Sequence, residues 1–432
     1  FWLQFCHYIP IIVYLLLNLA SGKKDKETVY SYRSSLIFSV LPLVFGILQM
    51  LYPDGSFYSN FSTWDTFRSV QAMYALLVPE RVDGMVDSML AHYKATGCLP
   101  IHVDFGIENH CMVAVHSVPL ITESYLKGFR GFDAELALEA VTNSLNVAHG
   151  GYPREDWDLL NAYGYIPFDK VFNQSASRTL EVAYDDACVE KMARAMGRDE
   201  VAGFFGRRAY AWTNLFDRSV GFIRGKDSSG NWRHPFDPDR TGWVSHPQFD
   251  FTEGSSWTYT WHVMQHPELL VETMGGKDAA GEKLEAFFSK PGRYDHGNEP
   301  GHHVAYFFQY AGRPWSAEKV LRRVSSTYHY ATDDGITGND DCGQVSCWYM
   351  FTALGFYPFD PSSCTYVIGA PQIDRAELKL ANGKTFTMVA HGLSDRAKYV
   401  KGVRLNGKPL DGFVLRHKDI AAGGDLAFRM GQ

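Results

Sequence analysis

Apolar residues recur at helical spacing over most of the chain after Pro53. Positions three and four residues apart share one face of a helix, so each such run predicts a helix with one buried face. Gly, Pro, Asn and Asp gather between the runs and mark loops. The pattern predicts helices at 65–79, 81–95, 111–127, 133–148, 176–197, 199–217, 258–274, 278–289, 300–312, 315–328 and 342–355.

Short Gly or Pro loops separate many of these helices, which indicates that neighbours pair antiparallel. Eleven or twelve helices in such pairs favour a mainly α fold, an α/α toroid. A long helix bundle is the main alternative, but several of the polar loops are longer than a bundle needs. Loops of this kind can converge at one end of a fold and form a site.

The period changes from helical to alternating after Pro361. Asn-Gly pairs at Asn382 and Asn406 follow alternating segments and are strong hairpin signals. We therefore expect three parts along the chain. They are an atypical segment at 1–52, a toroid domain at 53–364 and a small β-rich domain at 365–432.

The first 52 residues are unusually apolar. Residues 1–21 carry no Asp, Glu, Lys or Arg, and 36–51 are again apolar, with a charged segment between them. A membrane hairpin, or a signal anchor followed by a second span, would fit this pattern. Pro10 and Pro42 interrupt the two runs, which also fits an end that belongs to no ordered domain, a gene-model error included. Membrane association through 1–52 therefore stays an open interpretation.

Composition changes the picture in three ways. The chain has 432 residues, of which 46% are hydrophobic, so it can bury a large core. Its 41 basic and 48 acidic residues give a net charge of −7. The sequence has no run of basic residues that could bind along a phosphate backbone, so nucleic acid is not an expected partner. Aromatic residues make up 15%, and Trp and Tyr stack on sugar rings, which favours carbohydrate.

The seven cysteines are scattered and form no CxxC pair. They therefore predict neither a disulfide framework nor a zinc site. Glycosylation sequons begin at Asn60 and Asn173, but two are close to chance in a chain of this length. The compartment stays open, with the secretory pathway slightly favoured, and nothing in the sequence indicates an oligomeric state.

Candidate chemistry lies in the polar loops. Asn339, Asp340 and Asp341 precede a predicted helix, where the first-turn amides and the helix dipole stabilise carboxylates. A simple helix cap would explain either aspartate. Two other loops can be read in the same two ways, as caps or as parts of a site: 62–68 with Asp65, and 104–110 with Glu108. The loop 296–303 is denser in His, Asn and Glu than structure alone explains, because so many donors and acceptors would each need a buried partner.

Glu253 follows a different pattern, because Trp257, Tyr259 and Trp261 come shortly after it. A carboxyl group among aromatic rings loses hydration, which favours its protonated form and makes it a candidate general acid. A capped aromatic core helix is the alternative. Two carboxylates that flank a sugar bond are the minimum equipment for glycoside hydrolysis. Loops rich in carboxylates and Asn carbonyls also suit calcium better than a soft metal.

Seven runs resemble glycoside hydrolase family 92 in the same order over about residues 53–371. They are WDTFR (64–68), the loop from Glu108 to His116, YGYIPFD (163–169), AYDD (183–186), EGSSWTYTW (253–261), HGNEPGHH (296–303), and GNDDCGQVSCWYMFTALGFYP (338–358) with YVIGAP (366–371). The resemblance implies a calcium-dependent, inverting exo-α-mannosidase on an α/α toroid. The expected substrate is terminal mannose, α-1,2-linked above all, of N-glycans or mannan.

The resemblance also implies roles for residues. Glu253 falls on the general acid, and Asp341 is expected as the base, with Asp340 as the alternative. The calcium ligands fall on Glu299, His302, Asn339 and Asp340. The expected substrate-binding residues are Trp64, Asp65, Arg68, Glu108, Trp257, His296, Asn298 and Glu299.

Three departures from the family pattern matter. Ser255 and Thr258 stand where Asn and Gln are common, which changes the hydrogen bonds expected around Glu253. Asp340 replaces a usual Glu and shortens the reach to a cation by roughly 1 to 1.5 Å. The family also carries an N-terminal β-sandwich, whose place is taken here by residues 1–52. Rival hypotheses are therefore a catalytically inactive carbohydrate-binding protein and another α/α-toroid glycosidase.

Overall fold

The computed structural model describes residues 57–104, 107–146, 155–242, 249–332 and 335–432. The chain divides into two compact units. The described part of the smaller unit comprises 57–60, 103–104 and 107–109, and the larger unit runs over Phe61–His102 and His110–Gln432. The apolar segment 1–52, with its predicted membrane association, lies outside the described residues.

The described part of the smaller unit contains one strand pair. Strand β1 (Val103–Asp104) pairs antiparallel with β2 (Ile107–Glu108). The side-chain amide of Asn109 donates a hydrogen bond to the Asp104 carboxylate at 3.1 Å. Glu108 therefore lies on a strand, so of its two interpretations the role at the start of the following helix is wrong.

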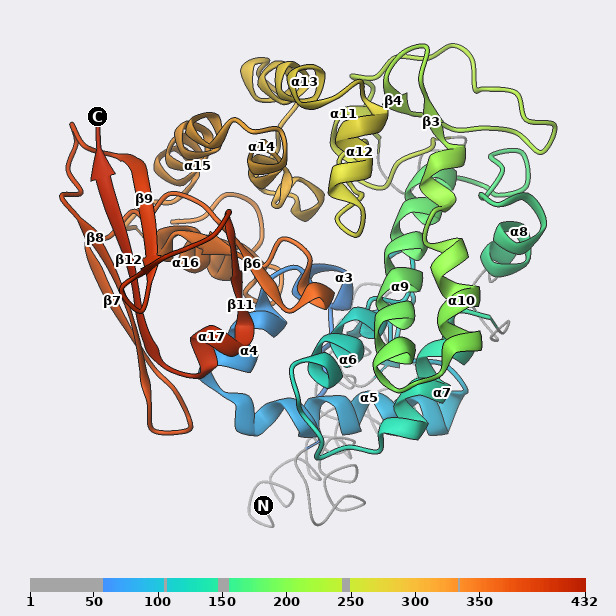
Figure 1. The fold of residues 1–432 in the computed structure, drawn as a ribbon. Coiled ribbons are helices and arrows are strands. Elements are labelled where there is room, and N and C mark those ends of the chain that lie inside the picture. Colours follow the sequence, from blue (N-terminus) through green and yellow to red (C-terminus); the bar gives the residue numbers. More distant parts are fainter. Residues whose placement is uncertain (1–56, 105–106, 147–154, 243–248, 333–334) are drawn as a thin grey trace, which may run out of the picture. The chain divides into compact units, whose positions relative to one another are not determined.

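The larger unit is mainly helical and forms an α/α toroid (Figure 1). Helix α16 packs against α4, so the last helix of the series contacts one of the first. The helices are α3 (Thr63–Thr66), α4 (Val70–Leu77), α5 (Val82–Thr96), α6 (Ser117–Leu126), α7 (Ala134–Ser144), α8 (Glu155–Tyr163), α9 (Ser175–Ala195), α10 (Asp199–Arg208), α11 (Ser256–Tyr259), α12 (Pro267–Thr273), α13 (Lys277–Ser289), α14 (Phe307–Tyr310), α15 (Pro314–Tyr328), α16 (Gln344–Leu354) and α17 (His417–Ala421). Short 3₁₀ turns are η1 (Pro79–Arg81), η2 (Ala211–Asn214), η3 (Glu299–Gly301), η4 (Val304–Tyr306) and η5 (Pro361–Ser363).

Helix α9 is buried on nearly every side. Most of its residues from Ser175 to Met192 are buried, and it contacts α6, α7, α8 and α10. A helix that is covered all round belongs to the interior, so its polar residues need partners there. This helix carries Glu181, Asp185 and Asp186, all of them fully buried.

The helix predictions were correct in the main, with informative differences. The predicted helix 300–312 is replaced by 3₁₀ turns and the short α14, because Pro300 and Gly301 do not sustain an α-helix. The helix 258–274 is broken before Pro267, which occupies the first position of α12. Helix 111–127 begins only at Ser117, and α8 was not predicted. The predicted end of 133–148 lies partly outside the described residues.

Residues 356–431 contribute two sheets. A three-stranded sheet has the order β11-β6-β5, and a five-stranded sheet has the order β10-β9-β12-β8-β7. Strand β12 runs parallel to β8 and antiparallel to β9. The strands are β3 (Phe216–Asp217) and β4 (Phe222–Ile223) in the helical region, and β5 (Phe356–Tyr357), β6 (Thr365–Ile368), β7 (Arg375–Lys379), β8 (Thr385–His391), β9 (Tyr399–Leu405), β10 (Lys408–Pro409), β11 (Val414–Arg416) and β12 (Gly424–Gly431).

Both predicted hairpins are present. Asn406 and Gly407 have φ of 50° and 76° and join β9 to β10, as a two-residue turn of primed type requires. The other hairpin joins β7 to β8 by a longer loop that contains Gly383 at φ 79°. Strand β5 precedes residue 365 and pairs with β6, so the three-stranded sheet spans the predicted domain boundary.

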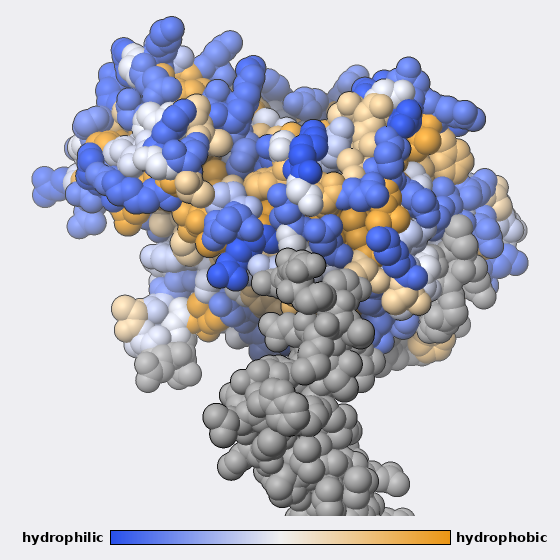
Figure 2. Space-filling model, turned by 90° about the horizontal axis from the view of Figure 1, so that it is seen from below, coloured by the Kyte–Doolittle hydropathy of each residue, from blue (hydrophilic) through white to orange (hydrophobic). Residues whose placement is uncertain are grey.

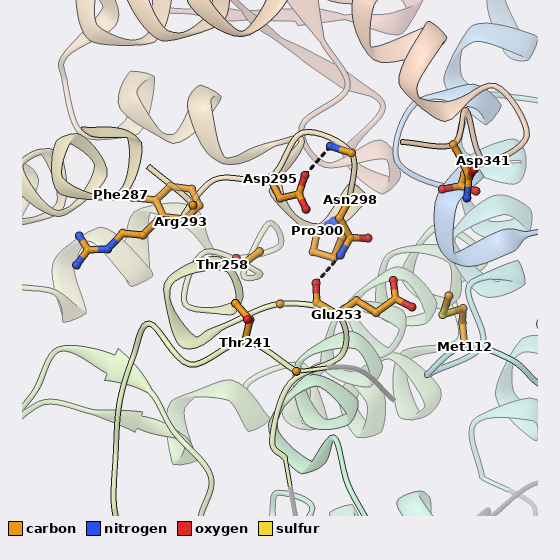
Figure 3. Close-up of a pocket in the computed structure, with 16 residues that line it drawn as sticks. Met112, Thr241, Glu253, Thr258, Phe287, Arg293, Asp295, Asn298, Pro300 and Asp341 are labelled. Carbon is orange, nitrogen blue, oxygen red and sulfur yellow. Dashed lines mark hydrogen bonds between the residues drawn. The ribbon is translucent and has the colours of Figure 1, made fainter. Parts of the chain in front are cut away.

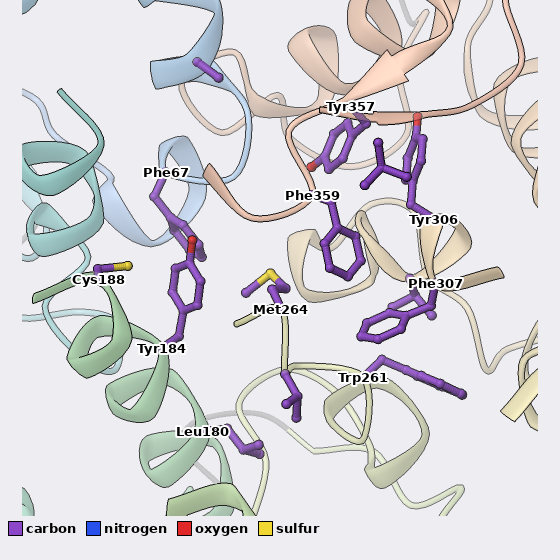
Figure 4. Close-up of a cluster of buried hydrophobic side chains, with 14 of the residues drawn as sticks. Phe67, Leu180, Tyr184, Cys188, Trp261, Met264, Tyr306, Phe307, Tyr357 and Phe359 are labelled. Atoms are coloured by element: carbon purple, nitrogen blue, oxygen red, sulfur yellow. The ribbon is translucent and has the colours of Figure 1, made fainter. Parts of the chain in front are cut away.

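Large aromatic side chains fill the core of the larger unit (Figure 4). Phe67, Tyr184, Trp261, Tyr306 and Phe359 come from five different segments and are nearly fully buried. Much of the 15% aromatic content therefore serves packing, because one such ring buries about 150 to 250 Å². The aromatic content alone was weak evidence for carbohydrate.

The surface is mostly hydrophilic on the face that Figure 2 shows, with hydrophobic residues in separate small groups. Single exposed apolar residues such as Phe172, Trp315 and Tyr330 are normal for a globular protein. None of the helices in the described ranges combines the length and the hydrophobicity needed to cross a bilayer.

Candidate active site

A cavity of about 580 Å³ brings together three of the polar loops singled out in the sequence (Figure 3). Glu253 and Thr258 come from the loop before α11 and its helix, Asn298 from the loop before η3, and Asn339 and Asp341 from the loop before α16. Its lining residues are Met112, Thr241, Gly242, Glu253, Gly254, Thr258, Phe287, Gly292, Arg293, Asp295, Gly297, Asn298, Pro300, Gly301, Asn339 and Asp341.

Glu253 lies half-buried at the cavity wall with a left-handed backbone, φ 47°. The side-chain amide of Asn298 donates a hydrogen bond to the Glu253 carbonyl, which fixes this turn to the neighbouring loop (Figure 3). Burial raises the pKa of Glu253, and the nearby Asp341 carboxylate raises it further. Both effects favour a protonated carboxyl group, as a general acid requires.

Asp341 enters the cavity from an unusual turn. Asp341, Cys342 and Gly343 have φ of 45°, 58° and 95°, so three consecutive residues are left-handed. The carbonyl of Asp340 accepts the amides of Gly343 and Val345, which holds the turn against the start of α16. A conformation that L residues rarely adopt thus places one carboxylate in the cavity.

Asp340 points to the helix instead. Its two carboxylate oxygens accept hydrogen bonds from the Ser346 amide and hydroxyl, each at 2.8 Å. It is absent from the residues that line the cavity. The two neighbouring aspartates therefore have different surroundings, one in the cavity and the other at the first turn of α16.

Three carboxylates form a compact group that could hold a metal ion. Oxygens of Asp65, Glu299 and Asp341 all lie within 4.8 Å of one another. Burial raises the pKa of Asp65 to about 7, and the carboxylate of Asp341 adds to this. Burial raises the pKa of Glu299 to about 9, helped by repulsion from Asp65 and Asp341. Without a cation, the three carboxylates cannot all be ionised at little cost.

One oxygen of the group has no hydrogen-bond partner in the described ranges of the chain. Oε1 of Glu299 is buried and accepts no hydrogen bond from the residues that the structure describes. The Asp65 carboxylate accepts a hydrogen bond from the hydroxyl of Ser62, and Ser62, at the N-cap position of α3, makes no capping hydrogen bond with its side chain. Three oxygen donors, one of them otherwise unsatisfied, are the donor set that a hard cation such as calcium prefers.

His296 and His302 of the 296–303 loop already have partners within the protein. His302 Nε2 lies 3.1 Å from the His296 carbonyl, and its Nδ1 lies 3.2 Å from the Gln344 amide. His296 contacts the Tyr294 hydroxyl and His329. Burial lowers the pKa of His302 to about 3, so its ring is neutral. Both rings therefore serve to connect this loop to its surroundings.

The loops of Glu299 and Asp341 touch through two glycines. A Cβ atom on Gly338, whose φ is 69°, would lie 2.9 Å from the Gly297 carbonyl oxygen. No side chain fits in such a contact. The glycine at 338, which directly precedes Asn339, is therefore needed to bring the two loops together.

Trp64, Arg68 and Trp257 belong to the larger unit but do not line the cavity. Trp64 and Arg68 are buried, with the Arg68 guanidinium 5.0 Å from the centre of the Trp64 ring. Its two terminal nitrogens are buried without a hydrogen-bond partner in the described part of the chain. Trp257 is covered by Arg293, whose guanidinium lies 3.8 Å from its ring centre. Glu108 belongs to the smaller unit.

The cavity also contains residues that the sequence did not single out as site residues. Arg293 and Asp295 line it directly before the 296–303 loop, and Met112 lines it directly after the polar loop 104–110. Their closeness in sequence to these polar loops was the available signal. Arg293 pairs with Asp239 at 2.6 Å, an ion pair between distant segments that no sequence pattern indicates.

Comparison with known proteins agrees with this geometry. The family model for the glycosyl hydrolase family 92 catalytic domain matches residues 20–432. A protein from Arthroderma benhamiae, described as an uncharacterized secreted glycosidase, is 26% identical over 379 residues, which are 80% of this chain and 48% of that protein.

Two solved structures from Bacteroides thetaiotaomicron are similar as well. One is a family GH92 α-mannosidase in complex with mannoimidazole, with a TM-score of 0.82, 36% identity, and coverage of 87% of this chain and 51% of that one. The other is a family GH92 inverting mannosidase, with a TM-score of 0.82, 33% identity, and coverage of 88% and 54%. This chain spans about half the length of these relatives. With a match over nearly its whole length, the chain belongs to glycoside hydrolase family 92.

Proposed function

We propose that this chain hydrolyses terminal α-linked mannose of N-glycans or mannan, with α-1,2-linked mannose as the expected substrate. One observation carries the proposal: two carboxylates, Glu253 and Asp341, line one cavity from separate loops. Family membership and the mannosidase relatives support mannose as the sugar.

The two carboxylates suit opposite tasks. Glu253 is held towards its protonated form by burial and by Asp341, so it can protonate the oxygen of the leaving group. Asp341 is the proposed base that removes a proton from the attacking water. In an inverting reaction, water must fit between the sugar and the base, and we predict a carboxyl separation of about 6.5 to 9.5 Å.

The group of Asp65, Glu299 and Asp341 fits a calcium ion. It offers only oxygen donors, and Glu299 Oε1 is buried without a partner among the described residues. When bound, calcium supplies a positive charge that attracts the hydroxyl oxygens of the sugar. We propose Asp65 and Glu299 as the main protein ligands, and Asn339, which lines the cavity, as a further oxygen donor. Asp340 and His302, predicted as ligands, already bind other groups of the protein.

An assay of mannose release tests the proposed function. The purified chain is incubated with α-1,2-mannobiose in calcium, and the first product is followed by proton NMR. Free β-mannose that appears before mutarotation supports an inverting mannosidase, and release of α-mannose contradicts inversion. Binding of the disaccharide without hydrolysis by the full-length natural protein supports the carbohydrate-binding alternative. Hydrolysis of glucosides in preference to mannosides points to another toroid glycosidase.

We propose that the protein acts in the secretory pathway or outside the cell, where mannose-rich glycans occur. The Arthroderma relative is described as secreted, which supports this location. Fractionation of expressing cells and medium tests it, and recovery of the protein only from cytosol contradicts it.

A further inference from the structure

Glu181 lies in the middle of α9, fully buried, and four polar side chains surround it. Its Oε1 accepts hydrogen bonds from Trp64 Nε1 at 3.2 Å and from the Tyr259 hydroxyl at 3.1 Å. Its Oε2 lies 2.7 Å from His116 Nε2 and 3.1 Å from His262 Nε2. A buried carboxylate is costly unless it is paired and hydrogen-bonded, so this site is built around its charge.

His116 supplies the countercharge. Its second ring nitrogen lies 2.8 Å from Oδ1 of Asp185, one helical turn after Glu181 on α9. Burial lowers the pKa of His116, but Asp185 and Glu181 outweigh this and raise it to about 9. Carboxylates only accept hydrogen bonds, so a protonated ring satisfies both. The other Asp185 oxygen accepts the Val115 amide at 3.0 Å, which fixes the start of α6.

The two donors to Oε1 belong to loops that carry proposed site residues. Trp64 directly precedes Asp65 of the carboxylate group. The ring of Tyr259 lies against Gly254, where an added Cβ atom would be 3.3 Å away, and Gly254 follows Glu253. One oxygen of Glu181 thus joins the loop of Asp65 to the loop of Glu253.

We propose that Glu181 is a positioning residue that, with His116, fixes the loop of Asp65 relative to the loop of Glu253. The kinetic consequences of this inference rest on the proposed function, whereas its structural part does not. Neither Glu181 nor its four partners line the cavity, so the residue acts through Trp64 and Tyr259 and does not touch substrate. Directional hydrogen bonds to one oxygen fix an orientation that apolar packing leaves free.

Tyr259→Phe tests the inference, because it removes one donor to Glu181 and keeps the ring. Tyr366→Phe is the matched control, since Tyr366 is equally buried and its hydroxyl lies 2.9 Å from His417 Nδ1. Hydrogen exchange of backbone amides, followed by mass spectrometry, measures how firmly each loop is held. We expect exchange in 62–68 and 253–261 to speed up about tenfold in Tyr259→Phe and to stay unchanged there in Tyr366→Phe.

Kinetics provide a second measurement. We expect Tyr259→Phe to lower kcat about tenfold with KM changed less than twofold, because misplacement by a fraction of an ångström affects the transition state most. The alkaline limb of the pH–rate profile should move to lower pH by about half a unit, as water reaches Glu253. Tyr366→Phe should change neither quantity.

A conservative substitution of Glu181 distinguishes a positioning role from a purely structural one. Glu181→Gln keeps an acceptor oxygen for Trp64 and Tyr259, so it should retain activity within about fivefold, whereas Glu181→Ala should lose at least a hundredfold. Unchanged loop exchange in Tyr259→Phe overturns the inference whatever the activity. Faster exchange in a protein that releases no mannose supports the inference and overturns the proposed function instead.

Discussion

Glu253 and Asp341 line the same cavity, and both have a left-handed backbone, with φ of 47° and 45°. Each such residue costs about 1 to 3 kcal/mol when it is not glycine, and it persists only where the surroundings fix it. Here the Asn298 amide fixes the first turn, and the Gly343 and Val345 amides fix the second. Two carboxylates with this backbone on one cavity support the proposal that Glu253 and Asp341 are the catalytic pair.

Glu253→Gln should lower kcat for mannoside hydrolysis by about 10² to 10⁴ while KM changes little, because the amide cannot donate a proton to the leaving group. Initial rates with an aryl mannoside that has a poor leaving group measure this. An activated leaving group needs less protonation and should recover part of the rate. Glu268→Gln, on the exposed surface of α12, is the control. Full activity in Glu253→Gln would contradict the assignment.

Asp341→Asn and Asp340→Asn form a matched pair of neighbouring substitutions. We expect Asp341→Asn to lose about 10² to 10⁴ in kcat and to keep its thermal stability, since Asn also tolerates the left-handed backbone. Asp340→Asn weakens the contacts with Ser346 and should cost about 1 kcal/mol of unfolding free energy, with a loss of activity below tenfold. Urea unfolding and initial rates separate the two effects. The reverse ranking of rates would make Asp340 the base.

Calcium should bind to the carboxylate group and stabilise the fold. Removal by a chelator should abolish activity reversibly and lower the melting temperature by a few degrees, as expected for a ligand that binds only the native state. Asp65→Asn and Glu299→Gln should weaken calcium at least tenfold in isothermal titration calorimetry. Asp295→Asn, which lines the same cavity outside the group, should leave the affinity unchanged. If wild type and the three variants bind calcium with equal affinity, the carboxylate group is not the calcium site.

Stability should fall between about pH 4.5 and 7 through Glu318 of α15. Burial raises its pKa to about 7, although the Val400 amide donates to it at 2.8 Å. The folded protein keeps a proton that the unfolded chain releases in this window, so stability decreases as pH rises. The unfolding free energy of Glu318→Gln minus that of wild type should therefore be about 1 to 2 kcal/mol larger at pH 8 than at pH 4.

Urea titrations at both pH values measure this difference. Glu282→Gln, on the exposed face of α13, should show no such dependence on pH. A wild-type and a Glu318→Gln protein with parallel pH curves would show that Glu318 ionises normally.

Gly338→Ala should uncouple the loops of Glu299 and Asp341. The new methyl group would lie 2.9 Å from the Gly297 carbonyl oxygen, so one loop must move. Gly407→Ala is the control, because its φ of 76° imposes a similar backbone strain and its Cβ meets nothing within 4 Å. Both should lose about 1 kcal/mol of stability, but only Gly338→Ala should lose activity, by at least tenfold. Equal activities would show that the glycine contact is not needed.

The sequence predicted much of the fold because the relevant signals are local. Helical periodicity located most helices, and Asn406-Gly407 located a two-residue hairpin. The parallel pairing of β12 with β8 could not be predicted, since it joins segments that no local turn connects. The helix at 176–197 was predicted, but the burial of α9 on all sides was not, because helical spacing of apolar residues indicates only one buried face.

The polar loops of the site were predictable, but the orientation of their side chains was not. Glu253, Asn298 and Asp341 line the cavity, and their catalytic and binding roles stay predictions. Asp340 and His302 turn to partners within the protein, and this depends on one backbone turn and on Gln344 from a distant part of the chain. Motifs indicate which loops meet, whereas hydrogen bonds across the fold decide which oxygen faces the cavity.

Strand β12 lies at the centre of the five-stranded sheet, although its residues 424–431 follow all other strands of that sheet in sequence. During synthesis, β8 and β9 therefore leave the ribosome with unpaired edges that only β12 can fill. Open strand edges attract other chains. A nascent chain that pauses before residue 424 therefore exposes strand edges that the complete sheet covers, and such edges favour aggregation.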